Sequence, residues 1–360
     1  MQKKNKVLII VIAIVLICAV AVSIVFSSGS GITKGTENIT DMAGRTVSVP
    51  SPVESVICTS PSMTTVVYMI APDKLKAIND NWKPNQLEFV PDKYKDLPVI
   101  GGWYGTHEAN YEEFISKAPD VVFESVRAND IDTINDRQDK MGEIPVVRVF
   151  DTSILTNNSD TILFVGKLLG EEATAQKLVD FNEKNINDIT GKVSSIPNKK
   201  NVYYAEGDNG LKTDGSKSQH AQLIKLAGGN NVADSVADTK SVDVSIEQVI
   251  SWNPDVIITT DPEFYSSVYK DSNWAEINAV KNHDVYLAPQ SPYDWFDMPV
   301  GINMIMGLPW VAKCIYPDEF KDLDLVNETQ YFYSNFYHFD LSKDQAKQIL
   351  LDSGLKEENL

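Results

Sequence analysis

The sequence predicts an α/β fold in which two doubly wound α/β lobes are joined by one long α-helix and preceded by an N-terminal transmembrane helix. Three observations lead to this prediction: a phrase that occurs once in each half of the chain, an uninterrupted helical stretch between the two copies, and an uncharged apolar run close to residue 1. The expected segments are a cytoplasmic stub, membrane anchor and short linker at 1–31, a first lobe at 38–157, connecting helices at 158–195, and a second lobe with terminal helices at 196–360.

The apolar run comprises residues 7–26 and follows Lys3, Lys4 and Lys6. A helix over this run would be about 30 Å long, which is enough to cross the hydrocarbon core of a bilayer. The lysines predict a cytoplasmic N-terminus and an extracytoplasmic body, so we expect a single-pass protein of the cell membrane. The alternatives are a cleaved signal peptide and a lipoprotein signal at Cys18. The run is longer than a usual signal core, and no small residue directly precedes the cysteine.

The overall charge limits the partners that the body can have. The formal net charge is −18, which disfavours contact with nucleic acid and with anionic lipid surfaces. We therefore expect no nucleic-acid partner. Cys58 and Cys314 stand beside apolar residues in apparent strand or helix, so we expect buried free thiols rather than a disulfide bridge.

Strands and helices alternate through the first lobe, which is typical of a doubly wound sheet. The connection at residues 79–98 contains Trp82 and three prolines and is longer than usual, so we expect it to shape the rim of a cleft. The expected strands are 53–59, 75–78, 99–100, 121–124 and 146–150, and the expected helices are 62–71, 112–117 and 131–141.

The repeated phrase begins at residue 110 and again at residue 245. Each copy is typical of an amphipathic helix, a Pro-Asp turn and a buried strand, which together form half of a βαβ unit. Two copies this far apart indicate two lobes of related architecture rather than a short solenoid repeat. A cleft between such lobes is where we expect the functional site. The matched pairs are Glu112 with Glu247, Ser116 with Ser251, Pro119 with Pro254, and Asp120 with Asp255.

The connecting region is helical apart from a break at Gly170. A helix over 171–193 would form a rigid strut from one lobe to the other. The second lobe is expected to begin with a strand at 201–205 and a helix at 219–227 that Gly228 ends. The remaining expected elements are strands at 256–260 and 285–288, an apolar helix at 301–316 that Pro309 interrupts, and a terminal helix at 343–353.

These motifs, in this order, resemble the substrate-binding proteins of ABC importers for iron chelates, haem and vitamin B12, in which a single helix joins two α/β lobes. The resemblance covers residues 38–316. It begins at 39–50, which is similar to the opening pair of strands, and includes the Glu-x6-Pro-Asp phrase in both halves and the segment 227–233. It implies a capture protein rather than an enzyme, without a cofactor of its own, that delivers its ligand to an ABC permease and the ATPase of that permease.

In the family, one carboxylate on the outer face of each lobe docks onto arginines of the permease. By position, the resemblance gives this role to Glu112 and Glu247. Charges at the two ends of a bilobal body would set the register and the rate of docking. The alternative is that both are ordinary acidic residues in the first turn of a helix, where the helix dipole favours them.

Ligands of doubly wound sheets meet the loops that follow the carboxyl ends of the strands. Aromatic rings in these loops suit a flat or bulky chelate, although the same rings could cap the core of a lobe. The loops are 59–62, 101–107, 125–129, 206–220, 260–265 and 289–297, and the candidate ligand contacts within them are Trp103, Tyr104, His107, Arg127, His220, Tyr265, Tyr293 and Trp295.

No direct metal site is expected, but an imidazole and a tyrosine can complete the coordination sphere of a chelated metal. Some siderophore binders of the family supply such a pair from the second lobe, and His220 with Tyr293 is the nearest match here. For His107 and His220, a surface or helix-capping role is the alternative.

Arg127 is the only arginine that we place in a cleft loop, so the cleft is weakly cationic and poorly suited to strongly acidic chelates. The leading expectation is therefore an iron-siderophore, haem or corrinoid ligand, with a molybdate or tungstate oxyanion as the alternative. A chelatase-like enzyme that uses His107 and His220 is a further alternative, although the sequence has no Walker loop, His-Glu-x-x-His motif or nucleophile elbow.

Overall fold

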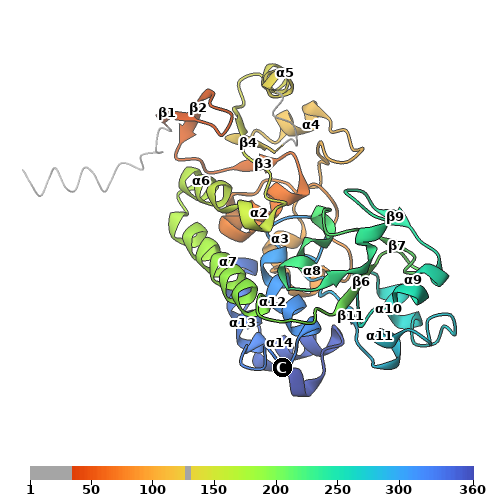
Figure 1. Cartoon of the computed structure of the whole chain (residues 1–360). Helices are drawn as coiled ribbons and strands as arrows, with labels where there is room; N and C mark the ends of the chain where they lie inside the picture. Colours follow the sequence, from red (N-terminus) through yellow and green to blue (C-terminus); the bar gives the residue numbers. More distant parts are fainter. Residues whose placement is uncertain (1–34, 126–130) are drawn as a thin grey trace, which may run out of the picture.

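The computed structural model of the protein describes residues 35–125 and 131–360. The expected membrane anchor at 7–26 and the expected ligand contact Arg127 lie outside these residues. The prediction of a mixed α/β fold with parallel sheets is confirmed (Figure 1). A three-stranded sheet has the order β3-β4-β5, and a four-stranded sheet has the order β11-β10-β6-β8, with all neighbouring strands parallel. The strands are β3 (Val56–Cys58), β4 (Val121–Glu124), β5 (Val146–Arg148), β6 (Asn201–Ala205), β8 (Asn230–Asn231), β10 (Val256–Thr259) and β11 (Val285–Leu287).

Two antiparallel pairs add to these sheets. The residues that resemble the opening strands of the family form the hairpin of β1 (Gly35–Thr40) and β2 (Thr46–Ser51). The second pair, β7 (Lys212–Thr213) with β9 (Val242–Asp243), belongs to the loops of the four-stranded sheet. After β6 the chain turns back, and β7 lies beside β6. The polar residues of the loop between these two strands therefore lie at the carboxyl end of the four-stranded sheet.

Helices flank both sheets, and several begin at side-chain caps that the sequence carries. Ser60 caps α2, Ser245 caps α9 and Asp261 caps α10, each by accepting a hydrogen bond from a backbone N–H of the first turn. The helices of the two sheets are α2 (Pro61–Ile70), α3 (Asp92–Lys95), α4 (Tyr111–Ser116), α5 (Ile131–Met141), α8 (Gln222–Leu226), α9 (Ile246–Trp252), α10 (Pro262–Ser267) and α11 (Asn278–Lys281).

Both copies of the repeated phrase fold in the same way, as α4 followed by β4 and as α9 followed by β10. The aspartate of each copy fastens the start of a neighbouring strand. Asp120 Oδ2 accepts hydrogen bonds from the backbone N–H groups of Glu54 (2.8 Å) and Ser55 (3.0 Å), and Asp255 Oδ2 accepts one from that of Asn201 (2.9 Å). The aspartate of each Pro-Asp pair therefore has the same role in both copies, which is to satisfy N–H groups at the start of a parallel strand.

The expected connecting helix is α7 (Glu172–Val193), whose 22 residues make it about 33 Å long. It follows α6 (Ser159–Leu169), which ends at Gly170 in the left-handed conformation (φ 69°). Figure 1 shows α7 along one side of the molecule, running from α6 toward the C-terminal helices. Those helices are α12 (Met304–Ile315), which contains Pro309, α13 (Leu325–Phe332) and α14 (Lys343–Asp352).

Both faces of each sheet are buried, as parallel sheets require. Successive residues of a strand point to opposite faces, so Ile57 joins one apolar cluster and its neighbours Val56 and Cys58 join another. The same division places Tyr203 and Tyr204 in different clusters. The largest cluster contains residues of both sheets and of α7 and α12, so the packing is continuous between the halves. The division into two lobes, with its boundaries, remains a prediction.

Several regions differ from the expectation. The residues expected as strands at 75–78 and 99–100 form only isolated bridges. The helix expected at 219–227 is a 3₁₀ turn followed by the short helix α8, and helix α12 begins three residues later than expected. α13 and the π turn Tyr333–Tyr337 were not expected at all. Cys58 and Cys314 are buried and unpaired, as expected. Within residues 35–125 and 131–360, no helix combines the length and apolar character that crossing a membrane requires.

Candidate functional site

A small cavity lies where loops that follow the two sheets meet, and we call it the junction cavity. Its volume is about 80 Å³. The first turn of α2, which follows the carboxyl end of β3, lies opposite residues that follow β11. This is the kind of position at which doubly wound sheets bind ligands. The lining residues are Pro61, Thr64, Ile78, Asn79, Asp80, Asn81, Trp82 and Gln86 on one side, and Tyr293 and Pro299 on the other.

Three hydrogen bonds beside the cavity hold the two sides together. Asn85 Nδ2 donates to Gln290 Oε1 (2.6 Å). Ser291 Oγ donates to the carbonyl of Gln86 (2.7 Å) and accepts from the backbone N–H of Phe89 (3.1 Å). The connection at 79–98, expected at the rim of a cleft, thus contacts the loop that follows β11.

Tyr293 is the expected ligand contact that the structure places in the wall of this cavity. Its side chain is 6% exposed, and its ring packs against those of Tyr68 and Trp82, with both centroids 5.4 Å away. The hydroxyl itself is inaccessible, so Tyr293 lines the cavity with its ring. Burial raises the pKa of Tyr293 well above its usual value, and a hydrogen bond with the Thr65 side chain offsets only part of this effect, so the phenol keeps its proton at neutral pH.

Trp103, Tyr104 and His107 lie near the cavity but outside its wall. The Trp103 ring packs on Phe114 (5.0 Å between centroids), and the Arg137 guanidinium lies 4.4 Å above it, so this indole belongs to the first-half core. The Tyr104 hydroxyl donates to Asp80 (2.7 Å), a residue of the cavity wall. Its ring stacks on the exposed His107 at 4.6 Å. Tyr104 and His107 thus remain candidates at the outer rim.

The structure places Trp295, an expected ligand contact, away from the junction cavity. Its side chain is fully buried in the core, near Tyr333, and presents no surface to a ligand. Tyr265 is half-buried against the cluster on the far face of the four-stranded sheet and approaches Gly354. Both rings pack against core residues in this structure, as the alternative for aromatic residues in these loops describes, and a ligand contact by either ring remains a prediction.

His220 and Tyr293, the suggested pair of metal ligands, take part in different networks. The Nδ1–H of His220 donates to Asp297 Oδ1, and Asp297 Oδ2 accepts a hydrogen bond from the Tyr204 hydroxyl (2.7 Å). The hydrogen bond to Asp297 raises the pKa of His220, which favours the imidazolium. This arrangement holds the ring in place at the carboxyl edge of the second sheet and leaves Nε2 available.

Two carboxyl groups beside this network were not singled out from the sequence. Burial, with the nearby charge of Asp214, raises the pKa of Glu206 to about 7. Burial also raises the pKa of Asp294 to about 7, although the backbone N–H groups of Phe296 (2.7 Å) and Asp297 (2.8 Å) stabilise its charged form. The position of Glu206 directly after β6 was the available signal, since that is where site residues of such sheets lie.

Glu112 and Glu247 occupy equivalent places, each as the second residue of its helix. Both side chains are exposed, and neither forms an ion pair with another described residue. An exposed carboxylate at the start of a helix suits both interpretations, docking and stabilisation by the helix dipole. For Glu247, hydrogen bonds from its own backbone N–H and from Ser245 lower the pKa of the carboxyl, as expected for a residue that caps its helix.

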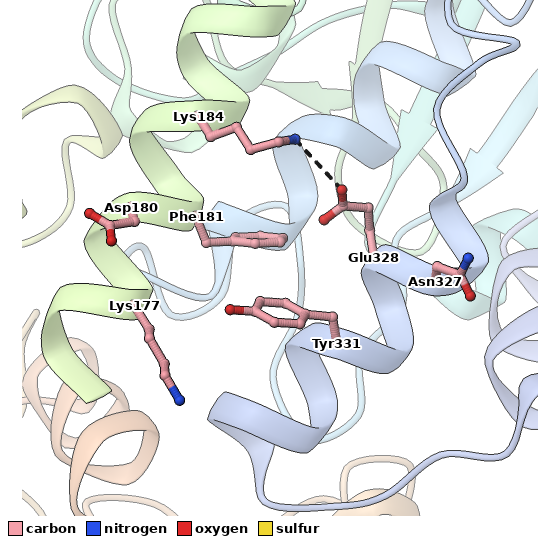
Figure 2. Close-up of a pocket in the computed structure, with 7 residues that line it drawn as sticks. All are labelled: Lys177, Asp180, Phe181, Lys184, Asn327, Glu328 and Tyr331. Carbon is pink, nitrogen blue, oxygen red and sulfur yellow. Dashed lines mark ion pairs between the residues drawn. The ribbon is translucent and has the colours of Figure 1, made fainter. Parts of the chain in front are cut away.

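A wider groove, of about 410 Å³, lies between α7 and α13. Figure 2 shows Phe181 of α7 beside Tyr331 of α13, with the Lys184–Glu328 ion pair (3.7 Å) across one end. The two rings are stacked, with centroids 5.6 Å apart. Because the groove lies along the connecting helix, it is separate from the loops at the strand ends.

Neither the junction cavity nor this groove offers a cluster of three or more His, Cys, Asp or Glu side chains that could hold a metal ion, and no such cluster occurs elsewhere among the described residues.

Comparison with known proteins gives this geometry a family. The family model described as "Periplasmic binding protein" matches residues 56–292. The chain is 27% identical to the molybdate-binding protein MolA of Haemophilus influenzae, covering 86% of this chain and 93% of the relative. It is also 27% identical to the high-affinity heme uptake system protein IsdE of Staphylococcus aureus, with coverage of 72% and 86%. Among solved structures, an ABC transporter solute binding protein from Sulfurospirillum deleyianum has a TM-score of 0.79 and 28% identity, with coverage of 87% and 98%.

The family match spans both parallel sheets, α7 and part of the loop after β11. The expected resemblance is therefore confirmed: this chain belongs to the periplasmic binding protein family, the substrate-binding proteins of ABC transporters.

Proposed function

We propose that this chain is the extracytoplasmic substrate-binding component of an ABC importer and that its ligand is a metal chelate of the iron-siderophore, haem or corrinoid class. The observation that carries the proposal is the junction cavity, which both halves line at the ends of their parallel strands. The apolar run at 7–26 would tether the body outside the cell membrane with the N-terminus in the cytoplasm. Glu112 and Glu247 would dock onto a permease that works with its ATPase.

A chelate of this class requires the two halves to move apart. Pockets for ligands of drug size are about 300–1,000 Å³, several times the volume of the junction cavity. The contacts beside the cavity that would separate are the hydrogen bonds from the exposed Asn85 and from the buried Ser291, and water can replace both once the halves part. Tyr104 and His107 at the rim, and His220 across from them, would then meet the ligand.

A small oxyanion such as molybdate is the second candidate, and the volume of the cavity favours it. An ion of this size needs no large separation of the halves. One relative, which matches this chain across both of its halves, is a molybdate-binding protein. The single acidic side chain in the wall, Asp80, disfavours a fully exposed dianion there.

Calorimetric titration and thermal shift with a panel of ligands test the proposal. The panel contains a ferric siderophore, haemin, cyanocobalamin, molybdate and tungstate. We expect one class to bind stoichiometrically and raise the melting temperature, as a ligand of the folded state must. Molybdate or tungstate alone would select the second candidate. If no member binds, capture of a metal-containing ligand is wrong.

The enzymatic alternative has a separate test. Incubation of the protein with porphyrin and a divalent metal should give no metal insertion above the uncatalysed rate, because the described residues hold no cluster of metal ligands. Metal insertion that the change His220→Ala abolishes would favour the chelatase instead.

A further inference from the structure

The two copies of the repeated phrase are most alike where their helices face outward. Residues 111–117, at helix α4, correspond to residues 246–252, which form α9. The buried position of the two helices differs, with Phe114 in α4 and Val249 in α9. Packing alone would give the reverse, because the core constrains buried side chains more than exposed ones. The positions with the same residue in both copies are all exposed, and they are Glu112 with Glu247, Ile115 with Ile250, and Ser116 with Ser251.

Helical spacing brings these identical residues together on one side of each helix. Residues three and four positions apart are neighbours on the surface of a helix. We call the two groups the matched faces, and they consist of Glu112, Ile115 and Ser116 on α4 and of Glu247, Ile250 and Ser251 on α9. Each matched face therefore places a carboxylate beside a branched apolar side chain.

The isoleucines of the matched faces have no packing role within the described part of the chain. Ile115 and Ile250 are each 42% exposed, and neither joins an apolar cluster that the described residues form. Their neighbours Phe114 and Val249 do belong to such clusters. A single exposed apolar side chain is common on protein surfaces and needs no explanation. The same residue with the same exposure in both halves points instead to a contact that both halves make outside the chain.

The chemistry of the matched faces selects the partner. An exposed carboxylate attracts a basic side chain, and the isoleucine beside it gains free energy when an apolar socket covers it. A second copy of this chain is a poor partner, because it would bring like carboxylates together. Proteins of this family work with an ABC permease, and the net charge of −18 favours a basic partner surface.

We propose that Ile115 and Ile250 are contact residues for the permease, each entering an apolar socket beside the basic residue that the neighbouring glutamate meets. The inference rests on the proposed function and deepens it, because that proposal assigns docking to the carboxylates alone. In this arrangement the carboxylates set the register and the rate of encounter. The isoleucines hold the complex together, since buried apolar surface slows dissociation.

Photo-cross-linking in intact cells that make this protein tests the contact. Photoreactive benzoylphenylalanine replaces Ile115, Ile250 or Tyr269 in turn. Tyr269 is the control, because it is 39% exposed, lies outside both matched faces and stacks on His283 near the start of β11 (4.9 Å between centroids). We expect the two isoleucine positions to give a product with the same ABC permease, identified by mass spectrometry, and Tyr269 to give none. A different partner at Ile115 and Ile250, a second copy of this chain included, overturns the inference.

Serine substitutions then measure the contribution of each isoleucine to binding of that permease, held with its ATPase in lipid nanodiscs. We expect Ile115→Ser and Ile250→Ser each to raise Kd about tenfold, as loss of an apolar anchor does. The double variant should raise Kd about a hundredfold, because the two positions are far apart in the fold and act independently. Ile115→Val and Ile250→Val keep a branched apolar side chain and should each raise Kd less than about threefold. The control Tyr269→Ser should leave Kd within about twofold.

The outcomes separate this inference from the function on which it rests. Melting temperature and ligand affinity should not change in the isoleucine variants, because both positions are exposed. If the double variant binds the permease as tightly as the unaltered protein, the inference is wrong and the docking role of Glu112 and Glu247 stays intact. A marked fall in its melting temperature would give the isoleucines a role in folding, which also overturns the inference. A protein that binds its ligand but cross-links to no permease contradicts the inference alone, whereas a failure to bind any ligand contradicts the proposed function.

Discussion

Ala118 and Asn253 stand at matching positions in the two copies of the repeated phrase, and both adopt the left-handed backbone conformation, with φ of 45° and 42°. Asparagine tolerates this conformation, whereas alanine is strained in it. We expect Ala118→Gly to raise the free energy of unfolding by about 0.5–1 kcal/mol. Asn253→Gly, the matched control, should change it by less. Urea denaturation measures both, and a less stable Ala118→Gly protein would show that the strain is absent.

Three titratable residues at the edge of the second sheet act on stability in the same direction. The pKa values of Glu206 and Asp294 are about 7 in the folded protein, above their ordinary values of 4.5 and 3.8. The folded state therefore binds more protons between about pH 4 and pH 7, and stability falls as pH rises through this window. His220, whose pKa is also raised, contributes stability below about pH 6.5 that is lost as pH rises through its folded pKa.

We therefore expect the melting temperature to be higher at about pH 5.5 than at about pH 8, and Glu206→Gln to reduce the difference. Glutamine retains an acceptor for the Ser241 hydroxyl, which lies 3.1 Å from Glu206 Oε2. Glu263→Gln, in the exposed first turn of α10, removes the same charge and is the control. Thermal melts across this pH range measure the effect. An unchanged pH dependence in Glu206→Gln would mean that its carboxyl ionises normally.

Single residues of the candidate site were only partly predictable from the sequence. Tyr293 and Trp295 were both expected at the site because their loop follows a strand. Tyr293 lines the junction cavity, whereas Trp295, two residues later, is fully buried in the core. The loop from Ser291 to Asp297 is buried throughout, and it has no regular periodicity that could separate inward from outward side chains. Burial of such a loop depends on α12 and on the C-terminal helices, whose packing the local sequence does not reveal.

At the scale of the element, the repeated aspartates show how a short phrase holds a sheet together. We expect Asp120→Ala to lower the free energy of unfolding by about 1–3 kcal/mol, because it leaves the N–H groups of Glu54 and Ser55 without their acceptor. Asp255→Ala, which removes one such bond, should cost about 1 kcal/mol. Asp120→Asn retains an acceptor oxygen and should lie between Asp120→Ala and the unaltered protein. Urea denaturation compares the three, and equal stability of Asp120→Ala and the unaltered protein would contradict the role.

The elements that the sequence predicted well are those with strong local signals. The strands are runs of β-branched residues, which are expected in a parallel sheet because both of its faces are buried. The helix α7 is a long amphipathic stretch without proline. α13 and the turn after it were missed. Their aromatic residues, such as Phe332, Tyr333, Phe336 and Tyr337, form no single apolar stripe, because all four are buried by contacts from several directions.

For the whole molecule, this C-terminal segment ties the halves together at a place other than α7. The Tyr68 hydroxyl of α2 donates to the carbonyl of Tyr337 (3.3 Å), and His338 Nε2 donates to the carbonyl of Tyr68 (2.8 Å). Phe89 of the rim connection packs against Tyr333 and Phe339. These residues lie beyond the matched family segment, which ends at 292. With α7 and this contact both in place, opening at the junction cavity is expected to be small in amplitude.

Because internal motion is limited, the outer faces of the molecule keep a fixed arrangement for docking. Glu112 and Glu247 are the charged residues that we propose for this docking. We expect the double change Glu112→Lys and Glu247→Lys to abolish uptake through the permease and leave ligand affinity unchanged, because both carboxylates are exposed and lie at the starts of α4 and α9, outside the wall of the junction cavity. The control, Glu113→Lys with Glu263→Lys, alters net charge equally at neighbouring exposed positions of α4 and α10. Uptake in cells and titration of the purified protein measure the two effects. Equal loss of uptake in the control would mean that overall charge, rather than these two positions, governs docking. A weaker ligand affinity in the Glu112/Glu247 variant would place the carboxylates in binding instead.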